Sequence, residues 1–387
     1  MKTLDFFEKF WAQVKPTQHW QDMLNTVEDS PWHREANTAV HTTMTIEEYI
    51  KQFFMHRTER QRMLTLMALL FHDFGKPEAE ETLEKKEEPG VFYRRYAGHE
   101  PISGNEFMSF MCDHHDLRQM FFAQGYNWHD IRTIKVMIEH HLPYGLKHVQ
   151  KRENLKHMIE KTLGDDQICF YDMLRSDAAG RISDDHPEKL LNVELWIENF
   201  QLVQWKPAKP RAQNAPQLVL VVGVSGAGKS TWIKHFNKDH FYTVFSEDKL
   251  RMEYYESIHG ANTDSSKTEA ELYHTAWNYC HLAKESKFDS FSKAEYGKLL
   301  AEGKNIIVDR MNHGRKARNT FVQPARDKGY KVASFEFFIS EQAAKNRQIG
   351  RQDKSLSDGR VHMIYMQQET PWYGPEVDTY VIVPPTF

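Results

Sequence analysis

The sequence predicts a two-domain protein whose first half is all-α and whose second half alternates helices with the strands of a parallel sheet. The chain has 387 residues, 40% of them hydrophobic, whereas a comfortable single domain has about 150 residues. The spacing of the apolar residues is helical before residue 204 and changes to short β-branched runs after residue 216. Between them lies a segment with three prolines and several small polar residues. We therefore expect domains at 1–203 and 217–387, joined by a linker at 204–216.

Composition excludes several classes of protein. The formal net charge is −4, so nucleic acid could be bound only through local basic patches. No apolar run approaches the roughly 20 residues that a membrane helix needs, and we expect no membrane partner. The three cysteines are widely spaced and odd in number, which favours a reducing compartment over a disulfide scaffold. We expect a soluble, cytoplasmic protein.

The first half is expected to be helical almost throughout. Residues 60–71 are apolar around most of a helix circumference, which is typical of a buried helix. Gly75 and Pro77 then end it. Helical spacing also predicts helices at 126–141 and 167–179, and the charged segment 78–88 is expected to be a solvated loop.

The second half is expected to contain at least four strands. Four short runs are rich in β-branched or aromatic residues, and helix-like segments separate them. These runs are 218–222, 243–245, 305–308 and 332–338. Strands that alternate with helices in this way favour a parallel α/β sheet.

A glycine-rich motif follows the first of these strands. Residues 223–230 read Gly-Val-Ser-Gly-Ala-Gly-Lys-Ser and match the phosphate-loop pattern at each fixed position. In this pattern backbone N–H groups converge on phosphate oxygens, the lysine neutralises the β- and γ-phosphates, and the serine holds Mg²⁺. We expect ATP or another NTP with Mg²⁺ here. The expected nucleotide-binding residues are Gly223, Ser225, Gly226, Ala227, Gly228, Lys229, Ser230, which also holds the metal, and Thr231.

Charged residues after the later strands are candidates for the acceptor side of a phosphoryl transfer. Asp248 follows the second strand, where it can accept a proton from an attacking hydroxyl, and Arg251 lies one helical turn further on. The alternative is that Asp248 caps a helix and Arg251 is a surface charge. Asp309 ends the third strand and is a weaker candidate for the substrate side. Arg347 and Arg351, four residues apart on an expected helix, could cover the nucleotide and stabilise transition-state charge.

Histidines concentrate in the first half, where 14 of the 21 occur before residue 205. Imidazoles together with carboxylates favour Mn, Co, Ni, Fe or Zn as ligand partners over calcium. His72 and Asp73 close the predicted buried helix, and Lys76 lies one turn past the pair. The other metal-ligand candidates are His41, His99, one residue of the pair 140–141, and Asp177. His33 is left open between a substrate contact and a structural role.

These motifs resemble two known families. The phosphate loop, Asp248-x-x-Arg251 and Arg347-x-x-x-Arg351 look like the polynucleotide 5′-hydroxyl kinase family over residues 216–387. The order His41, His72-Asp73, Asp177, with Asp-Ala-Ala-Gly-Arg at the last site, looks like the HD phosphohydrolase family. That resemblance implies two divalent transition metals held by these residues, His99 and His140, with Lys76 contacting phosphate. It also implies that Asp248 is the general base, Arg251 contacts the acceptor phosphate, and Arg351 is a lid arginine.

The two resemblances together are similar to the bacterial end-healing enzymes called HD-Pnk. They imply a kinase that phosphorylates a 5′-OH and a phosphohydrolase that acts on 2′,3′-cyclic phosphate or 2′-phosphate ends. The implied substrates are broken RNA ends, with DNA ends left open, and the implied functional partner is an RNA ligase. Three alternatives stay open: a nucleoside or metabolite kinase fused to a nucleotide phosphohydrolase, a catalytically idle first half, and an NTP-driven switch.

Overall fold

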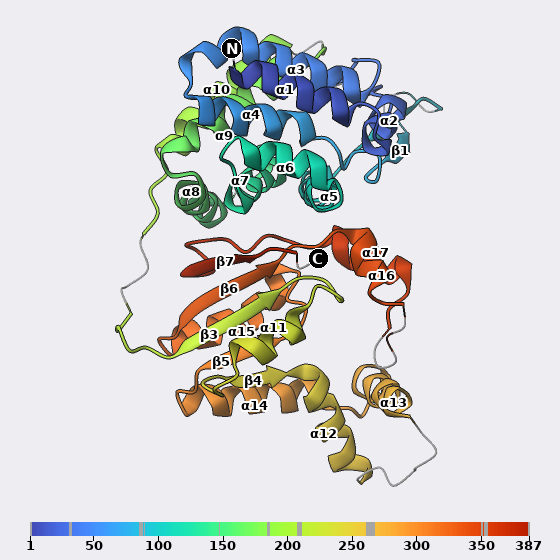
Figure 1. The fold of residues 1–387 in the computed structure, drawn as a ribbon, viewed down its shortest axis with the longest axis vertical. Helices are drawn as coiled ribbons and strands as arrows, with labels where there is room; N and C mark the ends of the chain where they lie inside the picture. The colour runs from blue at the N-terminus through green and yellow to red at the C-terminus, as the bar shows by residue number, and fades with distance from the viewer. Residues whose placement is uncertain are drawn as a thin grey trace. The chain divides into compact units, whose positions relative to one another are not determined.

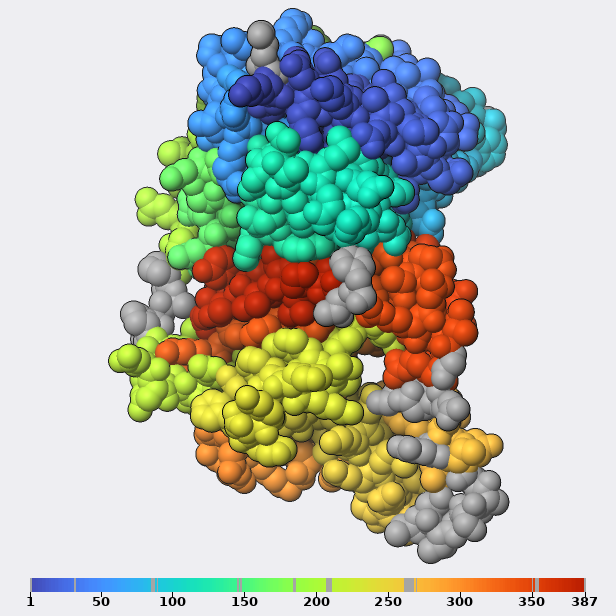
Figure 2. All heavy atoms as spheres, viewed as in Figure 1, coloured from blue at the N-terminus to red at the C-terminus, as the bar shows by residue number. Residues whose placement is uncertain are grey.

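The computed structural model describes residues 2–30, 33–84, 88, 90–146, 148–183, 186–206, 211–260, 268–349, 351 and 355–385. The chain divides into two units, Met1–Pro207 and Ala208–Phe387 (Figure 1). Figure 2 draws the atoms of the first unit in blue to green and those of the second in yellow-green to red. Residues 207–210 of the predicted linker lie outside the described residues. No helix among the described residues is long and apolar enough to cross a membrane.

The first unit is helical, as its apolar spacing predicts. The predicted helices at 60–71, 126–141 and 167–179 are confirmed as α4, α7 and α9, with shifts of one or two residues at most ends. Its helices are α1 (Lys2–Val14), α2 (Gln18–Asn25), α3 (Thr38–Gln52), α4 (Glu59–Phe71), α5 (His99–Asp113), α6 (His115–Ala123), α7 (Trp128–Glu139), α8 (Val149–Leu163), α9 (Ile168–Ala179) and α10 (His186–Gln201), with short 3₁₀ turns at Phe54–His56, Pro143–Gly145 and Gly164–Gln167.

The helix α4 is the centre of this unit. A capping box at Thr58 fixes its start, and every side chain from Met63 to Phe71 is buried. Helices α1, α3, α7 and α9 pack around it. Because the whole circumference of α4 is covered, the polar residues that follow its last turn are held inside the unit.

A two-stranded hairpin corrects the expectation of an all-α first half. Strand β1 (Glu81–Glu84) lies inside the segment 78–88 that was expected to be a solvated loop, and it pairs antiparallel with β2 (Phe92–Arg95), which lies just after that segment. The sequence Glu-Thr-Leu-Glu has no alternation of apolar and polar residues, because neither face of β1 is buried. The apolar pattern of the two strands therefore does not predict the hairpin, and contacts between β2 and Asp29 hold it in place.

The second unit contains one parallel sheet in the order β4-β5-β3-β6-β7. The four predicted strands are confirmed as β3, β4, β5 and β6, whereas β7 was not predicted. It is a half-buried edge strand that follows an irregular segment, and among the described strands it pairs with β6 alone. The bounds are β3 (Gln217–Val222), β4 (Thr243–Ser246), β5 (Ile306–Asp309), β6 (Lys331–Phe337) and β7 (Thr379–Val383).

Helices cover both faces of this sheet. Leu218, Leu220 and Val222 of β3 pack into one core, whereas Val219 and Val221 pack into the other. This period of two separates the layers. Helices α14 and α15 contribute to the first core, and α11, α16 and α17 to the second. The helices are α11 (Lys229–Phe236), α12 (Glu247–His259), α13 (Glu269–Leu282), α14 (Phe288–Ala301), α15 (Arg315–Asp327), α16 (Glu341–Asn346) and α17 (Asp358–Met366).

Candidate active sites

The predicted phosphate loop connects the central strand β3 to the start of α11. Gly228 lies immediately before the helix at φ 92°, a left-handed conformation in which a side chain would be strained. Lys229 begins α11 and is buried, and its Nζ donates to the carbonyl oxygens of Gly223 and Val224, each at 2.8 Å. Ser230 and Thr231 are exposed in the first helical turn. A glycine-rich loop that leads into a helix N-terminus, with a lysine ammonium held against the loop, is the arrangement that binds a polyphosphate in proteins.

The candidate acceptor residues lie at the same edge of the sheet as this loop. Strand β5 lies between β3 and β4, so the second strand is not the immediate neighbour of the first. In register, Ser246 at the end of β4 is opposite Asp309 at the end of β5. The chain after β5 touches the loop directly, because Gly223 N–H donates to the Met311 carbonyl at 3.0 Å. Asp309 therefore ends one strand, and Asp248 follows another, at the phosphate-loop edge of the sheet.

Asp248 lies in the first turn of α12 and is held by two donors. Its Oδ1 accepts from Arg251 Nη1 at 2.6 Å and from the Tyr273 hydroxyl at 2.7 Å. The Asp248 side chain is 34% exposed, so it is accessible from solvent. Burial and the Asp248 carboxylate both raise the pKa of Tyr273, so its phenol keeps its proton and donates. Tyr273 was missed by the sequence because a lone tyrosine in α13 carries no motif.

Arg251 is buried in a small ion-pair network. Its second guanidinium nitrogen, Nη2, lies 3.1 Å from Glu247 Oε2, and Arg310 Nη1 donates to the other oxygen of Glu247 at 2.8 Å. Arg251 is therefore shared between two carboxylates, and its expected contact with an acceptor phosphate would be made from a fixed position.

The cationic segment after α16 contacts the phosphate loop, although it is not the helix that was expected. Helix α16 ends at Asn346, so Arg347 and Arg351 are not on one helical face. Arg347 Nη1 nevertheless donates to the Gly226 carbonyl at 3.0 Å, and Arg351 Nη1 donates to Ser225 Oγ at 3.1 Å. Their proximity to the loop comes from tertiary packing and not from the predicted helical period.

In the first unit the predicted histidines and carboxylates converge from four places in the chain. His41 lies in α3, His72 and Asp73 follow α4, His99 begins α5, and Asp177 lies in α9. All are buried. His41 Nε2 is 3.0 Å from Asp177 Oδ1, and His72 Nε2 is 3.1 Å from Asp73 Oδ2. The residues that the sequence proposes as metal ligands are thus brought together.

The fifth position of this cluster is His141, which corrects the choice of His140. Helix α7 ends at Glu139 and His140 is its C-cap. The chain then turns, so that the His141 ring is buried 3.1 Å from His99 Nε2, measured between the two Nε2 atoms. His140 lies only partly buried and is not in either metal-capable group of the cluster. Adjacent histidines at a helix end cannot be distinguished by spacing, because the direction of the turn decides which faces inward.

Backbone carbonyls fix the orientation of all four imidazoles. The Nδ1 atoms of His72, His99 and His141 each lie 2.7 Å from a carbonyl three residues earlier, and His41 Nδ1 lies 3.2 Å from the Gly180 carbonyl. Since a carbonyl oxygen only accepts, each Nδ1 carries a proton, so the Nε2 atom of each ring is the one that a metal ion can take once that atom is deprotonated. This tautomer is the one that a metal-ligating histidine needs.

The Nε2 atoms face inward around Asp73. Asp73 Oδ2 lies 3.1 Å from His72 Nε2 and 3.6 Å from His41 Nε2, and Oδ1 lies 3.0 Å from His99 Nε2. Asp73 is therefore a carboxylate between two groups of imidazoles. The Nε2 atoms of His99 and His141 lie 3.1 Å apart, close enough to bind one ion together. Buried His72 Nε2 also has no hydrogen bond within the described part of the chain. This donor set fits divalent transition ions.

Two buried cations border the cluster. Lys76 Nζ lies 2.7 Å from Glu28 Oε1 and 2.9 Å from Asp73 Oδ2, and Arg181 Nη2 donates to Asp177 Oδ2 at 2.7 Å. Burial alone would raise the pKa of Asp73, but the charges of His72 and Lys76 outweigh it and hold this pKa well below its usual range. Burial is likewise outweighed at Asp177, where Arg181 and His41 lower the pKa. Both carboxylates are anionic, as metal ligands must be.

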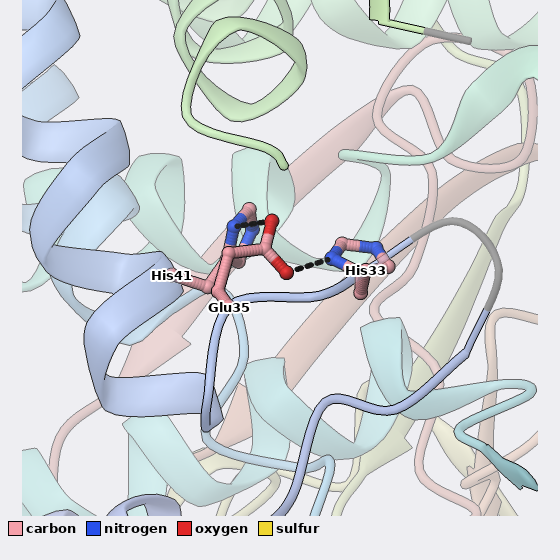
Figure 3. A group of neighbouring side chains, drawn as sticks. All are labelled: His33, Glu35 and His41. Atoms are coloured by element: carbon pink, nitrogen blue, oxygen red, sulfur yellow. Dashed lines mark ion pairs between the residues drawn. The ribbon is translucent and has the colours of Figure 1, made fainter. Parts of the chain in front are cut away.

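A second group, missed by the sequence analysis, supports His41 from outside the cluster. Glu35 lies between two imidazoles, with Oε1 3.5 Å from His41 Nδ1 and Oε2 3.4 Å from His33 Nδ1 (Figure 3). Its Oε1 also accepts from the Ile182 N–H at 2.8 Å, which ties it to the segment after α9. Burial lowers the pKa of His33 to about 4, with Lys76 and Arg181 adding to the effect. A glutamate two residues from a histidine in a loop gives no sequence signal for this role.

Gly180 permits the close approach that joins α9 to α3, and this gives a stability prediction. A Cβ at this position would lie 2.6 Å from the backbone nitrogen of Thr45. We expect Gly180→Ala to destabilise the first unit by about 1–3 kcal/mol through overpacking, measured as a lower midpoint in urea unfolding. Gly297→Ala in α14, where a Cβ meets nothing within 4 Å, is the matched control and should be neutral or stabilising. Equal midpoints for the two variants would contradict the prediction.

Comparisons with known proteins bear on the second unit. Residues 218–374 match the family profile AAA_33, described as an AAA domain. A curated protein of Autographa californica nuclear polyhedrosis virus, provisionally named a bifunctional polynucleotide kinase/RNA ligase, is 24% identical over 172 residues. That match covers 43% of this chain but only 23% of the viral protein, so the chain spans about a quarter of the relative's length.

Two solved structures overlap less than half of the chain. A provisionally named kinase from Chloroflexus aurantiacus has a TM-score of 0.32 at 14% identity, covering 46% of this chain and 88% of its own. A gluconokinase from Sinorhizobium meliloti has a TM-score of 0.29 at 17% identity, covering 45% of this chain and 86% of its own. The phosphate-loop geometry and the family match together identify residues 218–374 as a P-loop nucleotide-binding domain.

Proposed function

We propose that the chain is a bifunctional enzyme that repairs broken RNA ends. In this proposal the second unit transfers the γ-phosphate of an NTP to a 5′-OH polynucleotide end. The first unit, as an HD-type phosphohydrolase, removes phosphate from 2′,3′-cyclic phosphate or 2′-phosphate ends. RNA cleavage by transesterification leaves a 5′-OH and a 2′,3′-cyclic phosphate, so one chain would act on both products. An RNA ligase would be the functional partner that joins the healed ends.

The observation that carries the hydrolase half is the ring of four imidazoles whose Nδ1 protons are all donated to backbone carbonyls. Their Nε2 atoms, with Asp73 and Asp177, would hold two divalent ions such as Mn, Co, Ni, Fe or Zn. When bound, such ions polarise a phosphoryl group and make water a nucleophile at neutral pH. Lys76 places a positive charge beside Asp73 at the pocket wall, where it can contact a phosphate, and Arg181 holds Asp177 in position.

The kinase half rests on the phosphate loop and on Asp248 at the same edge of the sheet. As the 5′ oxygen bonds to the γ-phosphorus and the bond to the β-γ bridging oxygen breaks, Asp248 would take the hydroxyl proton. Lys229 and Arg351 would offset the charge on the transferring group, and Ser230 would hold Mg²⁺. Arg347 would bind the nucleotide, whereas Arg251 and Asp309 would serve the acceptor side. The name of the viral relative supports a polynucleotide as the acceptor.

One incubation tests both halves. An RNA oligonucleotide with a 5′-OH and a 2′,3′-cyclic phosphate is incubated with γ-labelled NTP, Mg²⁺ and a transition metal, and both ends are scored. We expect label at the 5′ end and loss of the cyclic phosphate. Efficient phosphorylation of free nucleosides without labelling of the oligonucleotide would replace the repair proposal by a small-molecule kinase. NTP turnover that is independent of any acceptor would replace it by an NTP-driven switch.

Asp248→Asn is expected to lower the kinase turnover number about 10²-fold while leaving the Michaelis constant for NTP nearly unchanged. The amide keeps the shape and can still accept from Arg251, but it cannot take a proton. Tyr273→Phe is the matched comparison, because it removes one hydrogen bond to the same oxygen and should cost less than the loss of the base. A near-normal rate for Asp248→Asn would show that Asp248 is not the general base and that its role is to stabilise the first turn of α12.

A further inference from the structure

A pocket lies beside the metal-capable cluster, and the proposed hydrolase function leaves part of it unassigned. The pocket has a volume of about 340 Å³. Its lining includes His99 of the cluster, Lys76 beside the cluster, Tyr96, and Arg94 and Arg95 at the end of β2. Residues of the proposed hydrolase site and residues of the hairpin therefore line the same pocket.

Hydrogen bonds from the hairpin to other segments hold Arg94 and Arg95 beside this pocket. Asp29 accepts from the backbone N–H of Arg94 at 2.8 Å and from its guanidinium at 2.7 Å, and Arg94 Nε lies 3.3 Å from Glu80. On the other side of Arg95, the Tyr96 hydroxyl donates to the Val27 carbonyl at 2.5 Å. The Tyr96 carbonyl also accepts from His99 Nδ1 at 2.7 Å. Residues on both sides of Arg95 are thus fixed, and one of them orients a candidate metal ligand.

Arg95 differs from Lys76 and Arg94 because its guanidinium has no partner among the described residues. Lys76 is paired with Glu28 and Asp73, and Arg94 with Asp29 and Glu80. Arg95 is exposed and makes no ion pair or hydrogen bond through its side chain with any residue that the structure describes. This includes Glu81, its cross-strand partner. An exposed guanidinium at a pocket wall, with no internal partner, is suited to a bidentate contact with an external phosphate.

We infer that the part of the pocket lined by Arg94 and Arg95 is a subsite for the phosphodiester that precedes the 3′-terminal nucleotide, and that Arg95 binds it. The inference rests on the proposed function. With the terminal phosphate at the metal-capable cluster, the strand can continue only in the 5′ direction. The next anionic group along the pocket is then the phosphodiester on the 5′ side of the terminal nucleoside. Arg95 is accordingly a specificity residue that favours polynucleotide ends over free mononucleotides.

The test compares Arg95→Gln with the wild-type full chain on two substrates. One is a short RNA with a 2′,3′-cyclic phosphate end, and the other is a nucleoside 2′,3′-cyclic phosphate, which lacks the preceding phosphodiester. We expect kcat/KM for the RNA to fall about tenfold, mainly through KM, because a charge-assisted hydrogen bond is lost. The value for the mononucleoside should be unchanged. The slope of log KM against log salt for the RNA should fall by about 0.7, and Arg95→Lys should recover part of the affinity.

Lys9→Gln is the matched control, because Lys9 is exposed on α1 and does not line the pocket, so the same change in net charge should leave both substrates unaffected. Equal losses on both substrates in Arg95→Gln would overturn the subsite while leaving the hydrolase proposal standing. If the wild-type chain hydrolyses neither substrate with any transition metal, the proposed function itself is wrong and the subsite falls with it.

Discussion

Replacing Asp73 by alanine is expected to lower the release of phosphate from 2′,3′-cyclic ends by about 10³-fold and to leave 5′-phosphorylation unchanged. Asp73 is the carboxylate between the two imidazole groups, with Oδ2 3.1 Å from His72 Nε2 and Oδ1 3.0 Å from His99 Nε2. Its removal takes away the negative charge that both groups share. Bound divalent ions contribute several kcal/mol of transition-state stabilisation, which corresponds to this loss in rate.

The measurement includes a readout besides activity. Metal bound per chain after loading and dialysis should fall in Asp73→Ala, while circular dichroism stays that of the wild type. Asp172→Asn is the matched control, since Asp172 is a buried carboxylate of α9 that pairs with Arg57 outside the cluster. It should lower stability but leave metal content unchanged. Full metal content and normal phosphate release in Asp73→Ala would show that the cluster is not the hydrolase centre.

Lys229→Ala is expected to lower 5′-phosphorylation by about 10³-fold while phosphate release from the 3′ end continues at the wild-type rate. The lysine begins the helix that leaves the phosphate loop, and its ammonium lies at 2.8 Å from two carbonyls of that loop. Removing one preorganised positive group that offsets transition-state charge typically costs 10²–10³ in rate. The cluster in the first unit contains no residue of the loop, so hydrolysis has no reason to change.

Transfer of label from NTP to the 5′ end and release of phosphate are measured on the same RNA. Lys234→Ala, which removes an exposed lysine one turn further along α11, is the control and should keep near-normal phosphorylation. If Lys229→Ala abolished both activities in a chain with an unchanged circular dichroism spectrum, the two sites would not be independent.

The sequence predicted the fold where one physical signal dominated. The apolar run that becomes α4 and the β-branched run that becomes β3 are each buried on all sides. A segment that is fully buried consists almost entirely of apolar residues, so its composition is enough to predict it. The hairpin that ends in Arg95 was missed because its strands are mostly exposed and one of its hydrogen-bond partners is Asp29, 65 residues before Arg94. The edge strand β7 was missed for a similar reason, since among the described strands β6 alone pairs with it.

The sequence predicted the place of those candidate residues that directly follow a recognisable motif or a buried helix. Lys229 is placed by the loop pattern, and His72 and Asp73 by the end of a buried helix. Choosing between His140 and His141 required the direction of a turn, which no spacing encodes. Tyr273 could not be found at all, because it reaches Asp248 from an element 25 residues away.

The carbonyl contacts of the four ring Nδ1 atoms have a consequence for how the first unit would handle its ions. Main-chain oxygens hold the orientation of each ring, so the side-chain entropy of these four donors is lost during folding. Removing bound ions with a chelator should therefore leave the four rings in the same orientation. Cations of different identity could then exchange in and out of the cluster repeatedly, with little rebuilding of the surrounding helices.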